Sequence, residues 1–134
     1  MISGIAHVNL LVPAGTLPEA NKFYVETLGL IASPVPAAIK ETTAWFNIGE
    51  SGQQIHIAFG NNEHKSTRHP CLRVGSVDDL LKVQRRIYEH HLAGDSAAPQ
   101  EADKPGESSG EKGVEFPSRF FARDYAGNRL EFSL

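Results

Sequence analysis

The strongest constraint on this chain is an internal repeat of a strand-turn-strand pattern. Within the closing stretch 118–134, residues 120–134 align with residues 45–59, and a glycine stands near the tip of each turn, where a tight hairpin needs a positive φ. An internal repeat determines the architecture more firmly than any single motif. The aligned pairs are Phe46 with Phe121, Gly52 with Gly127, Ile55 with Leu130, His56 with Glu131 and Ile57 with Phe132, at a constant offset of 75 residues.

The last strand shows which side chains share a face. Strand side chains alternate, so Leu130, Phe132 and Leu134 are expected to point into a core. Glu131 is then the acidic group on the opposite face, and His56 takes the same place in the earlier copy.

The elements expected along the chain also repeat. The first half reads strand, helix, strand and hairpin, and the second half begins again with a strand and an amphipathic helix. His69 stands in the second half where His7 stands in the first, and in both predicted strands the histidine lies opposite the apolar residues. The expected strands are 5–12, 30–32, 42–48, 53–59, 69–74, 118–123 and 129–134; the expected helices are 17–30 and 77–92.

Length favours a single domain over residues 1–134, with module one at about 1–60 and module two at about 69–134. Residues 93–113 are rich in small, polar and charged residues and have little to bury, which predicts a flexible polar insertion with one short or irregular strand. A solvated insertion and a lid over a site both fit this composition.

Charge and cysteine content exclude several classes of function. A net charge of −3 favours neither nucleic acid nor an anionic membrane as partner, and no apolar run is long enough for a spanning helix. Cys71 is the single cysteine, so no internal disulfide can form; together with the absence of a signal peptide this favours a cytoplasmic protein. A small buried residue is the expected role of Cys71.

The chain resembles the vicinal-oxygen-chelate superfamily of glyoxalase, bleomycin-resistance and extradiol-dioxygenase proteins. The resemblance rests on the strand with His7, the helix at 17–30, the strand opened by His69 and the ending at 124–132, where Tyr125 replaces the usual proline. It implies an α+β fold in which two βαβββ modules form a curled mixed sheet with a concave metal cleft. The implied metal ligands are His7, His56, His69 and Glu131.

These ligand types suit a divalent ion such as Ni, Co, Zn, Fe or Mn. An open coordination position can take up two neighbouring oxygens of a small substrate. The candidate catalytic residues are Glu131, a ligand that can double as a base, and His56. The residues that share strand faces with the candidate ligands are candidate substrate contacts: Asn9, Gln54, Arg73 and Arg129.

Three functions fit this pattern. The preferred one is a metal-dependent, glyoxalase-I-like lyase or isomerase acting on a small oxygenated molecule. An Fe(II) extradiol-type dioxygenase with His7, His69 and Glu131 as ligands is the second, and a metal-free module that binds a small ligand or confers resistance is the third. Because clefts in this superfamily are often completed by a partner chain, a homodimer is expected.

Overall fold

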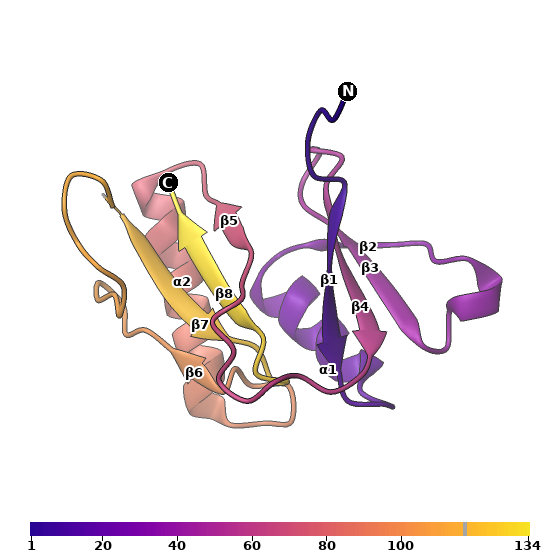
Figure 1. Ribbon diagram of the computed structural model, residues 1–134. Coiled ribbons are helices and arrows are strands. Elements are labelled where there is room, and N and C mark those ends of the chain that lie inside the picture. The colour runs from indigo at the N-terminus through magenta and orange to yellow at the C-terminus, as the bar shows by residue number, and fades with distance from the viewer. Residues whose placement is uncertain (117) are drawn as a thin grey trace. The chain divides into compact units, whose positions relative to one another are not determined.

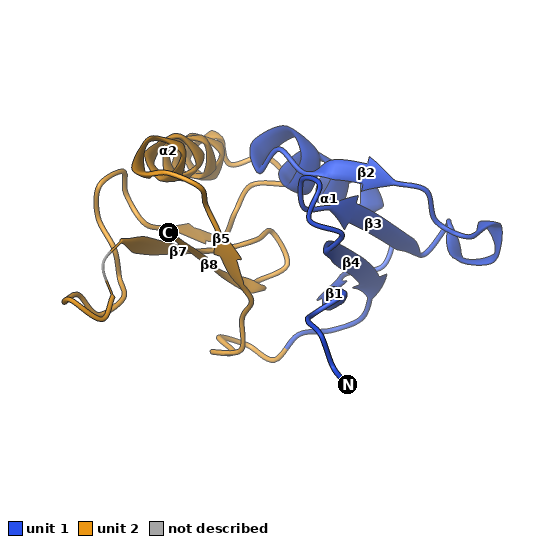
Figure 2. Cartoon of the chain, turned by 90° about the horizontal axis from the view of Figure 1, so that it is seen from above, with its two compact units in different colours: residues 1–62 blue, residues 63–134 orange. Residues whose placement is uncertain are grey.

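The computed structural model describes residues 1–116 and 118–134, which form two compact units, Met1–Asn62 and Glu63–Leu134 (Figure 2). Each unit contains one four-stranded mixed sheet. The strand orders are β1-β4-β3-β2 and β5-β8-β7-β6, so in both sheets the first strand of the unit lies beside the fourth, followed by the third and the second. The α+β class and the repeat are therefore confirmed.

In the first unit, β1 and β4 run parallel, whereas β3 is antiparallel to both of its neighbours (Figure 1). The elements are β1 (His7–Val12), α1 (Leu17–Asn21), the π-helix η1 (Lys22–Thr27), β2 (Ile31–Ser33), the 3-10 helix η2 (Ala37–Ile39), β3 (Thr43–Asn47) and β4 (Gln54–Phe59).

The second unit repeats this pattern, with β5 parallel to β8 and antiparallel pairs elsewhere. Its helix α2 covers one face of the sheet (Figure 2). The elements are β5 (Cys71–Arg73), α2 (Val77–Ala93), β6 (Glu101–Ala102), β7 (Arg119–Arg123) and β8 (Arg129–Ser133). The expected strand at 69–74 is shorter than predicted, and His69 lies two residues before it.

The first helical segment differs from the expected helix at 17–30. It is α-helical only to Asn21 and continues as η1, where the Leu28 amide donates to the Phe23 carbonyl, five residues back, at 2.9 Å. Gly29 then takes a φ of 80°, the left-handed conformation expected at a helix end. The predicted stop is confirmed, and the helix ends at Thr27.

The apolar faces predicted from strand alternation form the cores. Ile55 and Ile57 of β4 and Leu130 of β8 have no exposed surface, and Phe132 is 3% exposed. Burying a side chain of this size contributes about 1.5–3 kcal/mol. Leu134 lies beyond the end of β8 and is 39% exposed, so its expected burial is wrong.

Strand pairing corrects one aligned pair of the repeat. In the first unit Trp45 lies opposite His56, and in the second unit Phe121 lies opposite Glu131. The equivalent of Phe121 is therefore Trp45 and not Phe46. The cause is the turn, because Asn47 pairs with Gln54 in the first hairpin whereas Arg123 pairs with Arg129 in the second, which shortens the second turn by one residue.

The turn between β7 and β8 is organised by Asp124, which has no exposed surface. Its Oδ1 accepts hydrogen bonds from the backbone amides of Ala126 and Asn128, each at 2.9 Å, and Gly127 takes the predicted positive φ, 85°. The turn therefore sets the register that places Glu131.

The segment at 93–113 is attached to the second unit by a buried side chain. Gln84 of α2 is 3% exposed, and its Nε2 donates to the carbonyls of Lys104 and Glu107, each at 2.8 Å. Its Oε1 accepts from the Gly106 amide at 3.1 Å. The short strand expected in this segment is β6; the flexibility expected for the rest stays a prediction.

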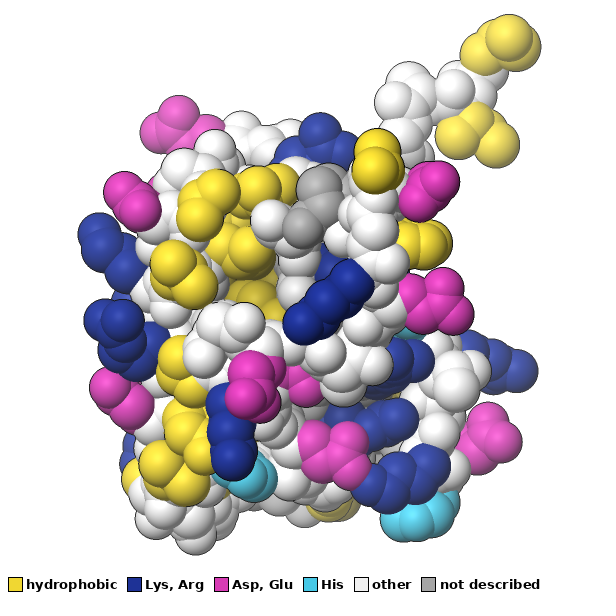
Figure 3. Space-filling view, turned by 90° about the vertical axis from the view of Figure 1, so that its left-hand side faces the viewer, with side chains coloured by type: hydrophobic (Ala, Val, Ile, Leu, Met, Phe, Trp, Pro, Cys, Tyr) yellow, Lys and Arg dark blue, Asp and Glu magenta, His cyan; other side chains and the backbone are white. Residues whose placement is uncertain are grey.

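On the side shown in Figure 3, Lys and Arg side chains lie among Asp and Glu side chains, and hydrophobic side chains gather in the upper part of the view and again at its lower left. Within residues 1–116 and 118–134, no helix combines the length and apolar character needed to cross a membrane.

Asp124→Ala is expected to lower the free energy of unfolding by about 2–3 kcal/mol, because two partly buried amides lose their acceptor. Urea denaturation followed by circular dichroism measures this. Asp124→Asn retains one oxygen acceptor and is expected to cost less, and Glu89→Ala at an exposed helix position is expected to change stability by less than about 0.5 kcal/mol. A loss of that small size for Asp124→Ala would contradict the role assigned to the turn.

Candidate functional site

In the second unit, two of the predicted ligands are in contact. The parallel pairing of β5 with β8 places Glu131 beside Cys71, and His69 lies just before β5. The Nε2 atom of His69 is 3.0 Å from Oε2 of Glu131. These side chains are 24% and 12% exposed, so the contact is largely shielded but accessible from one side.

The hydrogen bond made by Nδ1 of His69 determines whether Nε2 can donate to Glu131. Nδ1 lies 2.7 Å from the Thr67 carbonyl oxygen, which can only accept, so Nδ1 carries a proton. In a neutral imidazole, Nε2 is then an acceptor that faces a carboxylate oxygen. Two acceptors at 3.0 Å need a positive charge at Nε2, either a proton or a metal ion.

The second oxygen of Glu131 is held by Arg119, a residue that the sequence reasoning missed. The Nη1 atom of Arg119 donates to Oε1 of Glu131 at 3.1 Å, and its Nη2 donates to the Glu111 carbonyl at 3.2 Å. The guanidinium also lies 4.2 Å from the Phe116 ring centre. Arg119 is two residues before Phe121 on β7, so alternation could have placed it on the face of Glu131.

Cys71 is exposed, which corrects the expected buried role. Partial burial, followed by the charge of Glu131 and a hydrogen bond with it, raises the pKa of the Cys71 thiol above 9.0, against the lowering effect of Arg119 and Arg73. The thiol is therefore protonated at neutral pH in the metal-free protein and is a poor nucleophile.

In the first unit, the other two predicted ligands stack on each other. The rings of His7 and His56 are 3.8 Å apart with an interplanar angle of 10°, and Trp45 stacks on His56 at 4.6 Å. His56 thus lies in a stack that the pairing of β3 with β4 and of β1 with β4 produces.

His56 is neutral at neutral pH. Burial, and then the charge of His7, lower its pKa below the usual 6.5. Its Nε2 lies 2.7 Å from Oε1 of Gln54, whose Nε2 donates to Asn47 at 2.8 Å. Because that amide oxygen is an acceptor, Nε2 of His56 carries the proton and Nδ1 keeps its lone pair.

The candidate substrate contacts divide between the units. Asn9 is exposed opposite His56, and Gln54 is engaged with His56 as described. Arg73 is exposed on β5, and Arg129 is half-buried on β8, where its guanidinium lies 4.4 Å from the Phe121 ring centre.

Among the residues the structure describes, no three His, Cys, Asp or Glu side chains are grouped closely enough to hold an ion. Each unit supplies a pair, His7 with His56 and His69 with Glu131. The donor set nevertheless fits a divalent metal. In an octahedral site with metal–ligand bonds of about 2.1 Å, adjacent ligands lie about 3 Å apart, which is compatible with the 3.0 Å between His69 and Glu131, a distance that an ion pair also takes.

A family model described as the glyoxalase/bleomycin resistance protein/dioxygenase superfamily matches residues 4–132. Comparison with curated proteins gives no match.

Several crystal structures have a similar fold. A glyoxalase family protein from Bacillus anthracis is 29% identical, with 98% of this chain and 94% of that chain covered and a TM-score of 0.68. The fosfomycin resistance protein FosX from Listeria monocytogenes is 16% identical, with 99% and 91% covered and a TM-score of 0.72. A FosX variant was solved in complex with Mn(II) and 1S,2S-dihydroxypropylphosphonic acid; it is 17% identical over 99% and 92%, with a TM-score of 0.71.

Arg119→Met is expected to lower the free energy of unfolding by about 1–3 kcal/mol, because a largely buried carboxylate oxygen of Glu131 loses its charged donor. Arg119→Lys keeps the charge and is expected to cost less. The exposed Arg73, changed to Met, serves as the matched control in the same urea titrations. Equal effects of the changes at Arg119 and Arg73 would show that the contact with Glu131 adds no stability.

The low pKa of His56 predicts a pH dependence of stability. His56 binds a proton less readily in the folded than in the unfolded protein, so its contribution is present above about pH 6.5 and is lost as the pH falls through its lowered value. Unfolding of the metal-free protein can be followed by the fluorescence of Trp45, the single tryptophan. His56→Gln is expected to flatten this dependence, whereas the exposed His64→Gln is expected to preserve it; equal slopes for all three proteins would refute the assignment.

Proposed function

Because the chain belongs to the glyoxalase/bleomycin resistance protein/dioxygenase superfamily, we propose that it is a divalent-metal enzyme acting on a small oxygenated molecule. The proposed ligands are His7, His69 and Glu131, with His56 as a fourth ligand or as a catalytic base. The two units act together as one domain in this proposal, which is supported by the family match across both of them.

The observation that carries the proposal is the contact between His69 and Glu131. Nε2 of His69 and Oε2 of Glu131 face each other at 3.0 Å, where a metal ion can take the place of a proton, while Arg119 and the Thr67 carbonyl hold the two side chains from behind. Carboxylate and carbonyl partners behind metal ligands are typical of metal centres, where they orient the ligand and select its tautomer. A metal-free binding module does not require this arrangement.

A divalent ion held by His7, His69 and Glu131 would supply Lewis acidity to two neighbouring oxygens of a substrate, which would acidify the adjacent C–H. The chain itself offers two groups that can accept that proton. His56 is neutral at neutral pH and has a free lone pair on Nδ1, and Glu131 is a carboxylate whose Oε1 is held by Arg119. A neutral base near a polarised C–H favours a glyoxalase-I-like lyase or isomerase.

An Fe(II) extradiol-type dioxygenase is the second candidate. It is favoured by one observation, the engagement of His56 Nε2 with Gln54, which leaves His7, His69 and Glu131 as two histidines and one carboxylate. Assays with 2-oxoaldehydes, with and without a thiol, distinguish the lyase from an oxygenase, which would consume O2 with catechols.

The proposed ligands are tested by elemental analysis after anaerobic reconstitution with Ni, Co, Zn, Fe or Mn. About one ion per chain is expected for the unchanged protein, with affinity lowered at least about tenfold in His7→Ala and Glu131→Ala. His64→Ala, which changes an exposed histidine outside the repeat, is the matched control. Metal content that survives both ligand changes would show that the proposed centre is wrong.

The homodimer and the cytoplasmic location stay predictions. Sedimentation of the metal-loaded protein tests the first, and cell fractionation tests the second.

A further inference from the structure

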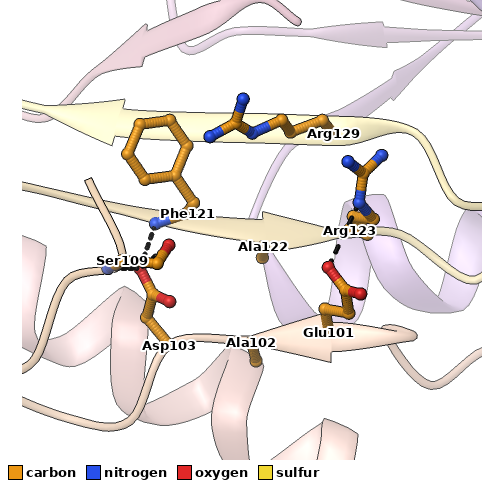
Figure 4. A pocket seen from close by; sticks show the side chains of 8 residues that line it. All are labelled: Glu101, Ala102, Asp103, Ser109, Phe121, Ala122, Arg123 and Arg129. Carbon is orange, nitrogen blue, oxygen red and sulfur yellow. Dashed lines mark hydrogen bonds and ion pairs between the residues drawn. The ribbon is translucent and has the colours of Figure 1, made fainter. Parts of the chain in front are cut away.

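The second unit contains a pocket of about 390 Å³ on the face of its sheet that carries Glu131. Phe121, Arg123 and Arg129 line it from β7 and β8, and Glu101 lines it from β6 (Figure 4). Phe121, Arg123 and Arg129 alternate along their strands with the buried Phe120, Ala122 and Leu130, and Glu101 pairs with Arg123, so these four residues share one face of the sheet.

Arg129 is the unusual group in this pocket. Its guanidinium lies over the Phe121 ring at 4.4 Å, a contact that holds the side chain against the sheet. No hydrogen bond or ion pair joins it to another residue within 1–116 and 118–134. Its donors are therefore held in place but unused, in a half-buried position.

A second arginine stands directly opposite. Arg123 pairs with Arg129 across the two strands, and like charges in that position destabilise a sheet unless they are compensated. Arg123 is compensated, because it donates to Glu101 at 3.2 Å and to the carbonyls of Ser66 and Gly127 at 3.0 Å each. Arg129 has no such partner among the described residues.

The two carboxylates that line the pocket are both engaged by groups other than Arg129. Glu101 is shared between Arg123 and Lys65, which lower its pKa through hydrogen bonds and charge. Asp103 accepts at Oδ2 from the Phe121 amide at 2.8 Å and from the amide and hydroxyl of Ser109 at 3.0 and 3.1 Å. The lining carboxylates, Glu101 and Asp103, equal the lining arginines in number, but Glu101 is paired with Arg123 and Asp103 is engaged with neutral donors, so neither is paired with Arg129.

We propose that this pocket is an oxyanion-binding subsite, in which Arg129 binds a carboxylate, phosphonate or phosphate group of a small molecule. A planar guanidinium presents paired N–H groups that match the oxygens of such a group. The compensating charge that Arg129 lacks among residues 1–116 and 118–134 is then supplied by the ligand.

The position of the subsite defines a substrate class, and this step rests on the proposed function. Arg129 and Glu131 are two residues apart on one strand face, a spacing of about 6.7 Å. A molecule that reaches both carries its anionic group a few bonds from the oxygens that chelate the metal. Small anionic hydroxy or oxo compounds fit, whereas neutral dicarbonyls leave Arg129 unpaired.

The subsite is tested on the full chain, freed of metal with EDTA, so that binding to a metal does not contribute. Inorganic phosphate, methylphosphonate and acetate are titrated by calorimetry, and the Arg129 side-chain N–H signal is followed by NMR. Saturable binding is expected, together with a shift of that signal. Arg129→Gln is expected to weaken binding about tenfold or more, and Arg129→Lys to weaken it less.

Arg85→Gln removes the same charge from an exposed position on α2 and is expected to leave binding unchanged. Absence of saturable binding, or equal weakening by the changes at Arg129 and Arg85, would overturn the subsite. Glu131→Gln separates the two proposals, since it is expected to abolish metal binding and to retain phosphate binding. If the unchanged protein binds phosphate through Arg129 but takes up no metal, the subsite is supported and the proposed enzyme is refuted.

Discussion

The parallel pairing of the first and last strands in each unit determines which side chains meet. A parallel pair needs a long crossover, and in both units a helix and two further strands supply it. The pairing brings His7 toward His56 and His69 toward Glu131, although 49 and 62 residues, respectively, separate the partners in the sequence. The contact of His7 with His56 and that of His69 with Glu131 follow from these two ladders.

Glu131 links the repeated strands to the polar segment before β7, a part of the chain that differs between the units. One of its oxygens faces His69, and the other is held by Arg119, which also binds the carbonyl of Glu111. Gly110, beside Glu111, lies so close to Phe121 that an added Cβ would be 2.5 Å from the ring. The polar segment before β7 is therefore packed against the residues that position the carboxylate, and its composition alone did not reveal this.

Alternation and the repeat were sufficient to predict the element order and the core faces of β4 and β8, whereas the role of His69 and Glu131 as metal ligands came from the family resemblance and stays a prediction. Contacts that depend on turn length or on a distant segment were not predictable in this way. The role of Arg119 needs the register of β7 against β8, and the anchoring by Gln84 needs the path of residues 104–107. The change from α-helix to π-helix after Asn21 has no signal in the sequence that we recognise.

The one-residue difference between the two hairpin turns affects how the copies can diverge. A longer turn moves β3 by one position against β4 but leaves the pairing of β4 with β1 intact, so Trp45 takes the place that Phe121 has in the other copy. An insertion at a hairpin tip can thus change which aromatic residue lies beside a candidate metal-binding residue without displacing that residue. After a gene duplication, loop-length variation of this kind offers a route to new substrate selectivity that leaves the coordinating strands unchanged.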